Sequence, residues 1–190
     1  GNDTVLYTFV ALTAGVVVNL NAGTIDKTVA TGTIRDTVTS IENVVGSDYD
    51  DVFVTNLTTA NMIDGGETDT IGTAALYGEE LVGDYVDYSS NGATKIVIDL
   101  TKSQTSTVLS TYRVSNDGFG NKEYIDGIEN IITGSGDDIV YGDAEINVIT
   151  TGAGDDIIRG GAEADTIDGG TNTAVGDTAD FSDLAFGVTV

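Results

Sequence analysis

Between Thr133 and Asp168 the chain repeats one pattern of small, polar and aliphatic residues every nine positions. The four blocks read TGSGDDIVY, GDAEINVIT, TGAGDDIIR and GGAEADTID. Each block opens with small or turn-forming residues, has Asp or Asn in its sixth position and has a branched aliphatic residue in its eighth. Such self-similarity is typical of repeat proteins, in which each unit buries its apolar face only against its neighbours.

The two halves of each block favour different local structures. The last three residues, as in 139–141, are β-formers and predict a very short strand. The first six are rich in Gly and Asp, which adopt turns. We therefore expect two blocks to close one coil of a flattened right-handed spiral, with the eighth-position residues stacked inside. A solvated Gly/Asp-rich linker is the alternative, but a linker has no reason to keep an aliphatic residue in the eighth position of all four blocks.

Stacked coils place the sixth-position side chains in pairs. Asp138 is expected beside Asp156 on one edge, and Asn147 beside Asp165 on the other. Carboxylates held close together repel unless a cation lies between them. Hard oxygen ligands from side chains and turn carbonyls, held in a flexible loop, suit Ca²⁺ better than Mg²⁺.

Composition supports a chain that folds when it binds metal. The 190 residues include 7 Lys and Arg against 31 Asp and Glu, a net charge of −24. This charge argues against nucleic acid and anionic lipid as partners and makes the metal-free chain self-repelling. Yet 40% of the residues are hydrophobic, too many for a permanently disordered tail. Folding on metal binding reconciles the two observations.

Several kinds of chemistry are excluded by the residues that the sequence lacks. There is no Cys and no His, so a disulfide framework, a thiolate metal site, imidazole catalysis and the usual zinc sites do not arise. No stretch reaches the length of a membrane span, so we expect no direct membrane insertion.

The nine-residue blocks resemble the RTX (repeats in toxin) family, with its pattern G-G-x-G-x-D-x-U-x, where U is a large aliphatic residue. The resemblance implies an all-β fold, a right-handed parallel β-roll or β-solenoid with Ca²⁺ ions in the turns between short strands. It also implies that each ion lies between like-facing turns, bound by sixth-position side chains and by backbone carbonyls of positions one to four.

Carried over to this chain, the family pattern implies two calcium sites. The first takes Thr133, Ser135, Asp138, Gly152, Gly154 and Asp156. The opposite one takes Gly142, Ala144, Asn147, Gly161, Glu163 and Asp165. Because Asn147 replaces an Asp and Glu163 replaces a Gly of the family pattern, we expect the second site to bind more weakly or to be empty.

The nine-residue blocks lie within a longer repeat. The segment 41–54 aligns with 128–141, an offset of 128 − 41 = 87 residues. We predict one unit at 1–82 with degenerate RTX repeats at 46–71, a second at 83–175 with strong repeats at 133–168, and the start of a third at 176–190. Matching positions add further candidate calcium ligands, namely Asp3, Asp51, Asp69, Asp84, Gly170 and Asp177.

The segments between the blocks are less regular. The apolar runs at 16–20 and 95–100 are expected to continue the same solenoid, although separate β-sandwich domains are an alternative. Residues 21–36 are predicted to be a loop or a hairpin. Both ends of the chain fall inside the pattern, so we expect it to be an excerpt of a larger secreted protein.

Adjacent carboxylates such as Asp137 and Asp138 raise the question of glycoside hydrolysis, but every such pair falls in a turn of the repeat. No nucleophile elbow is present either, so we expect no enzyme. The resemblance implies a calcium-dependent structural module of a bacterial adhesin or surface-layer protein, exported by type I secretion and folding outside the cell. Its partners would be calcium ions and neighbouring repeats. The alternatives are a module attached to a secreted enzyme (alginate epimerase, metalloprotease or lipase) and a module that binds surface glycan or polysaccharide.

Overall fold

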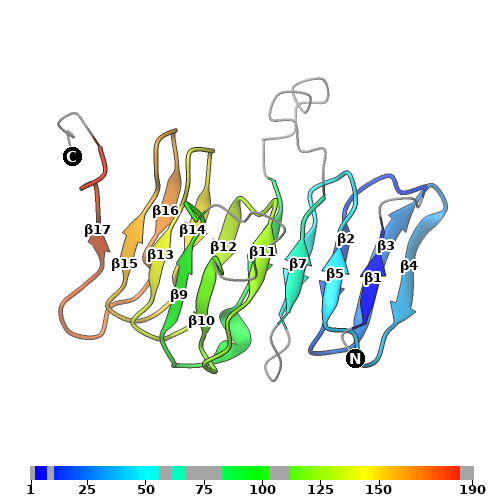
Figure 1. The fold of residues 1–190 in the computed structure, drawn as a ribbon, viewed down its shortest axis with the longest axis horizontal. Helices are drawn as coiled ribbons and strands as arrows, with labels where there is room; N and C mark the ends of the chain where they lie inside the picture. Colours follow the sequence, from blue (N-terminus) through cyan, green and yellow to red (C-terminus); the bar gives the residue numbers. More distant parts are fainter. Residues whose placement is uncertain (1–2, 8–10, 56–60, 67–82, 103–111, 185–190) are drawn as a thin grey trace. The chain divides into compact units, whose positions relative to one another are not determined.

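The computed structural model describes residues 3–7, 11–55, 61–66, 83–102 and 112–184, and these residues form an all-β protein (Figure 1). The described residues contain no α-helix, and their one helical turn is the 3₁₀ segment Ser89–Asn91. Contacts group the chain into two compact units, 1–87 with 124–130 and 88–123 with 131–190. The repeat units at 1–82, 83–175 and 176–190 remain a prediction from the sequence.

The first sheet of unit 1 is built from three-residue strands that are all parallel. Its order is β1 (Thr4–Leu6), β5 (Asn43–Val45), β7 (Met62–Asp64) and β11 (Tyr124–Asp126). In a strand this short only the middle side chain faces the core, because side chains alternate between the two faces. Accordingly Val44, Ile63 and Ile125 are fully buried.

The second sheet of unit 1 is mixed. Its order is β8 (Tyr85–Asp87), β6 (Val52–Val54), β2 (Val16–Asn19), β3 (Thr24–Val29) and β4 (Gly32–Thr37). The first three strands are parallel, whereas β3 and β4 continue the sheet in antiparallel fashion. The prediction for residues 21–36 is therefore resolved as a hairpin. Only two residues separate β3 from β4, and so short a connection joins antiparallel strands.

Unit 2 contains the strong nonapeptides. One sheet has the order β10 (Val114–Asp117), β9 (Ile96–Asp99), β13 (Ile139–Tyr141), β15 (Ile157–Arg159) and β17 (Thr178–Ala179). The other has β16 (Thr166–Asp168) beside β14 (Val148–Thr150), followed by the last two residues of β12 (Asn130–Ile132). All these pairs are parallel where their register is defined, except that β10 runs antiparallel to β9.

The register in unit 2 follows the nonapeptide. Val140 pairs with Ile158, and Ile149 pairs with Ile167, so β13 and β14 each neighbour the strand 18 residues later. This interval is what two nine-residue blocks per coil require. The eighth-position side chains of Val140, Ile149 and Ile158 are buried, and Ile167 is half-buried.

The expected fold class is thus right at the level of an all-β protein with stacked short strands, but not in every pairing. In the described residues the sheets that contain β10 and the β3–β4 hairpin are mixed, and the strands do not close into a wholly parallel solenoid. The antiparallel strands β3, β4 and β10 belong to the segments between the nonapeptides, where the nine-residue period is absent. The apolar runs at 16–20 and 95–100 do pair in parallel with β6 and β13.

Candidate calcium sites in the turns

The sixth-position carboxylates of unit 2 form a ladder along one edge. Asp138 Oδ1 accepts the backbone N–H of Ile96 at 2.7 Å, and Asp156 Oδ1 accepts that of Asp138, also at 2.7 Å. Asp177 Oδ1 continues the series by accepting the N–H of Asp156 at 3.0 Å. Each carboxylate therefore lies against the backbone of the preceding coil, and the structure brings Asp138, Asp156 and Asp177 together in one row.

The second carboxylate oxygen of Asp138 and of Asp156 is a candidate ligand for a cation. The Oδ2 atoms of Asp138 and Asp156 are buried and have no hydrogen-bond partner in the described structure. Burial raises the pKa of Asp138 to about 6 and also raises the pKa of Asp156 above its ordinary value. A buried carboxylate oxygen without a partner is costly when ionised. Hard, anionic oxygens in stacked turns are the donors that Ca²⁺ prefers, so the residues fit this ion.

The remaining ligands must come from the backbone. Among the residues that the structure describes, no group of three or more Asp, Glu, His or Cys side chains could hold a metal. The two carboxylates Asp138 and Asp156 therefore need turn carbonyls beside them to fill the six to eight positions around a calcium ion. This division between two side chains and several carbonyls is the one that the nonapeptide pattern implies.

The turns that carry those carbonyls stack at hydrogen-bond distance. The Thr133 hydroxyl donates to the Thr151 carbonyl at 3.0 Å, and the Gly152 carbonyl accepts the N–H of Thr171 at 2.8 Å. Gly154 N–H donates back to the Thr171 carbonyl at 2.9 Å. At Gly170, φ is 77° and a Cβ atom would collide with the Gly152 carbonyl. Of the ligands expected on this edge, Ser135 is exposed and donates its N–H to the Gly92 carbonyl at 3.1 Å.

The opposite edge holds the second pair. The N–H of Asn147 donates to Asp165 Oδ1 at 3.0 Å, which brings this pair together as expected. The Asn147 side chain is already engaged, since its Oδ1 accepts the N–H of Asp143 at 3.0 Å. Burial, followed by the charges of Asp143 and Glu163, raises the pKa of Asp165. One neutral amide oxygen in place of a carboxylate makes this edge less attractive to a cation.

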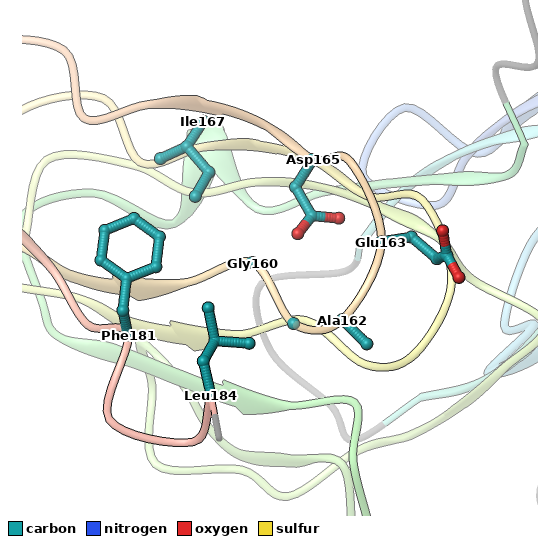
Figure 2. A pocket seen from close by; sticks show the side chains of 8 residues that line it. Gly160, Ala162, Glu163, Asp165, Ile167, Phe181 and Leu184 are labelled. Atoms are coloured by element: carbon teal, nitrogen blue, oxygen red, sulfur yellow. The ribbon is translucent and has the colours of Figure 1, made fainter. Parts of the chain in front are cut away.

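A hollow of about 230 Å³ opens beside this edge (Figure 2). The side chains of Ile167, Phe181 and Leu184 gather at one end of it, and Asp165 and Glu163 lie towards the other. The turn Gly160–Ala162 completes the lining. Of the other expected ligands, Gly142 is buried, Gly161 approaches the carbonyl of residue 143, and Ala144 is exposed.

In unit 1, Asp51 and Asp84 form a similar row of hydrogen-bonded carboxylates. Asp51 is fully buried, and its Oδ1 accepts the N–H of Val16 at 2.5 Å. The N–H of Asp51 donates in turn to Asp84 Oδ1 at 2.6 Å. Ser47 donates its backbone N–H to Asp51 Oδ2 at 2.5 Å and its hydroxyl to Oδ1 at 2.9 Å, so protein groups already contact both oxygens. Asp3 is exposed, and Asp69 lies outside the described residues.

Two kinds of residue whose carboxylates accept backbone N–H groups beside the candidate ligands were not predicted from the sequence. The first is the glutamate of each repeated IEN triplet: Glu42 Oε2 accepts the N–H of Asp3 and Glu129 Oε2 that of Asp84, both at 3.0 Å. The offset of 87 between the triplets was the available clue. The second is the fifth-position Asp155, whose carboxylate accepts backbone N–H groups of residues 173–176, and these contacts hold its pKa well below the usual range.

Short parallel strands at an 18-residue interval, joined by turns with a carboxylate row, define a stacked nonapeptide repeat. The family model for the RTX calcium-binding nonapeptide repeat (4 copies) matches residues 125–145 and 141–173. The chain therefore carries RTX calcium-binding nonapeptide repeats, and calcium is the ion that these repeats bind. Both the family resemblance and the calcium cofactor are thereby confirmed. The degenerate repeats at 46–71 lie outside the matched residues and remain a prediction.

No curated protein matches the chain. Within the part of the chain that the structure describes, no helix is both long and apolar enough to cross a membrane.

Proposed function

We propose that the chain is a structural module whose nonapeptides fold as a right-handed parallel β-roll when Ca²⁺ binds between their turns. The observation that carries the proposal is the pair of buried carboxylate oxygens, Asp138 Oδ2 and Asp156 Oδ2, which have no hydrogen-bond partner. The first ion would lie between the stacked turns of this edge. Its ligands would be the two carboxylates and backbone carbonyls from Thr133, Ser135, Gly152 and Gly154.

Further ions would bind along the same row and on the opposite edge. Asp177 accepts the N–H of Asp156 as Asp156 accepts that of Asp138, so a second ion would take the carboxylates of Asp156 and Asp177 and the Gly170 carbonyl. On the opposite edge, Asn147 and Asp165 would bind more weakly with carbonyls of Gly142, Ala144, Gly161 and Glu163. In unit 1, Asp51 and Asp84 occupy equivalent places, with Asp3 and Asp69 as outer candidates.

The charge of the chain explains why the fold should depend on the ion. With a net charge of −24, the metal-free chain repels itself. Closing the coils brings carboxylates together between them, which adds desolvation and repulsion at the same positions. Each Ca²⁺ offsets two of these negative charges where they are closest, so binding free energy becomes folding free energy.

The proposed setting is a large secreted or cell-surface protein of the adhesin or surface-layer type. A chain that stays expanded until it meets extracellular calcium is suited to export in an unfolded state, as in type I secretion. We assign no catalytic role to the paired carboxylates, because they lie in the turn positions of the repeat. A module attached to a secreted enzyme would share this calcium-dependent fold. A module that binds surface polysaccharide would differ by retaining glycan ligands on an array, which a passive scaffold would not do.

The decisive experiment is far-UV circular dichroism of the 190-residue chain in EDTA, then across a Ca²⁺ titration, with Mg²⁺ as the control. We expect a coil spectrum that changes to a β spectrum with Ca²⁺ and not with Mg²⁺. A β spectrum that EDTA leaves unchanged would contradict the proposal, because the apolar stack would then stand without metal.

A matched pair of variants tests the ligand assignment. Asp156→Ala removes the carboxylate that accepts the N–H of Asp138 and that would share a second ion with Asp177, whereas Asn147→Ala removes a neutral amide from the weaker edge. Loss of an outer-shell partner typically weakens metal binding about 10–100-fold, so loss of a ligand at two sites should cost at least as much. We expect Asp156→Ala to raise the midpoint of the calcium titration well above that of Asn147→Ala. Equal midpoints would refute the assignment.

A further inference from the structure

The block that follows Asp168 is longer than the others. Strand β17 pairs with β15 through Ile157 and Thr178, an interval of 178 − 157 = 21 residues in place of 18. The block 169–180 therefore has twelve residues, and the three extra ones are 173–175. Despite the insertion, Asp177 reaches the carboxylate row and accepts the N–H of Asp156 at 3.0 Å.

One side chain of the preceding coil holds the inserted residues. Asp155 Oδ1 accepts the backbone N–H groups of Thr173 and Ala174 at 3.0 Å and of Gly176 at 3.1 Å. Asp155 Oδ2 accepts the N–H of Val175 at 2.9 Å. The Val175 side chain itself is 90% exposed, so the loop is held by its backbone and not by burial.

Asp155 is in turn fixed to the coil before it. Its own N–H donates to Asp137 Oδ1 at 3.0 Å, which ties the two fifth-position residues together. Asp137 provides the matched comparison. It occupies the same position of the repeat one coil earlier, but the block it faces has nine residues and no insertion.

Packing alone does not set the register at β17. This strand has two residues, and Ala179 stands where the other blocks place Val or Ile. Ala179 is exposed and pairs with the buried Ile158, so the strand gains little from the core. A twelve-residue block could therefore pair out of step by several residues at small cost in apolar burial.

We propose that Asp155 is a positioning residue for calcium: by accepting hydrogen bonds from the backbone N–H groups of the three-residue insertion, it brings Asp177 into register with Asp156. The inference rests on the proposed function, because it takes Asp156 and Asp177 to share an ion. Asp155 is not itself a ligand in this assignment, since its carboxylate oxygens already accept four backbone N–H groups.

The test compares Asp155→Ala with its rescue by deletion of residues 173–175, which turns the long block into the nine-residue GGTNGDTAD. Isothermal titration calorimetry of the full chain counts bound calcium ions and measures their affinity. We expect Asp155→Ala to lose one ion or to bind it about 10–100-fold more weakly, as for other outer-shell partners. The deletion alone should bind as the parent chain does. The deletion combined with Asp155→Ala should restore the lost ion, because a nine-residue block does not need the carboxylate.

Val175→Ala serves as the control and should leave the ion count unchanged, because it removes an exposed side chain of the same insertion and keeps the N–H that Asp155 accepts. Amide hydrogen exchange of residues 173–176 gives a second readout, since these N–H groups should lose protection in Asp155→Ala at saturating calcium. An unchanged affinity in Asp155→Ala, or a double variant as defective as Asp155→Ala, would overturn the inference. If Asp155→Ala does not fold, the double variant still tests the inference. Recovery of folding and of the ion count in the double variant would support the positioning role of Asp155, and failure to recover would contradict it.

The two proposals fail in distinguishable ways. A parent chain that binds no calcium would refute the proposed function. If the parent chain binds calcium and Asp177→Ala loses an ion while Asp155→Ala does not, only the positioning role of Asp155 is wrong.

Discussion

Two adjacent isoleucines in β15 allow the stacked arrangement to be tested without touching the turns. Ile158, in the eighth position of its block, is 2% exposed, whereas Ile157 beside it is 37% exposed on the other face of the strand. The two residues have the same side chain, the same strand and the same helix and strand propensities. Ile158→Ala and Ile157→Ala therefore differ only in the environment from which the side chain is removed.

The expected losses follow from that environment. Removing three buried carbons costs about 2.4 kcal/mol at roughly 0.8 kcal/mol per group, and the cavity left behind raises the range to about 2–5 kcal/mol. For Ile157 the loss comprises partial burial and strand propensity, which together amount to about 1 kcal/mol or less. Ile158→Ala should therefore destabilise the chain at least twice as much as Ile157→Ala.

Urea unfolding at saturating calcium, followed by far-UV circular dichroism, measures both free energies of unfolding. The slope against urea should be similar in the two variants, so that the midpoints can be compared directly. Equal losses, or a larger loss from Ile157→Ala, would mean that the eighth position does not face the core. The register of every nonapeptide in unit 2 would then be wrong by one residue, because a slip of one exchanges the two faces of a strand.

Two further predictions concern buried and exposed hydrogen bonds. The hydroxyl of Tyr88 donates to Glu123 Oε2 at 2.6 Å inside unit 2, so Tyr88→Phe should cost about 1.5–3 kcal/mol in urea unfolding, whereas Tyr49→Phe, which loses only a 3.4 Å contact, should cost less than about 0.5 kcal/mol. Hydrogen bonds from Arg159 and residue 182 lower the pKa of Asp180 to about 2, so its contribution to stability is present above the ordinary pKa of an Asp and is lost as the pH falls through about 2. A carboxyl NMR titration should show this low midpoint, and Arg159→Gln should move it upwards; an unchanged midpoint would remove the ion pair as the cause.

The strict nonapeptides could be predicted well because their constraints are periodic. An aliphatic residue in every eighth position fixes which side chain of a three-residue strand faces inwards, and the nine-residue interval then fixes the neighbour 18 residues later. The pairing of Asp138 with Asp156 and of Asn147 with Asp165 follows from the same register. The calcium titrations of Asp156→Ala and Asn147→Ala test the assignment of these pairs as ligands.

The segments between the blocks were predicted less well because their structure depends on features that do not repeat along the sequence. The hairpin at 24–37 follows from a two-residue connection that the sequence left open as a loop or hairpin. In unit 1, Ser47 donates two hydrogen bonds to Asp51, and nothing in the degenerate repeat predicted this contact. The role of Asp155 depends on a three-residue insertion that occurs once in the described nonapeptides, so no repetition could reveal it.

The same period that builds the apolar stack also places the charges that oppose it. Each nonapeptide adds one eighth-position aliphatic side chain, whose burial contributes about 1.5–3 kcal/mol. On the Asp138 edge it also adds one sixth-position carboxylate, and taking an ion out of water without a counter-ion costs several kcal/mol. The sixth and eighth positions are only two residues apart. A coil that buries its aliphatic side chain therefore also holds its carboxylate close to the carboxylates of the neighbouring coils. Adding more coils therefore does not free the stack from its need for cations, and dependence on calcium should persist however many such blocks are joined.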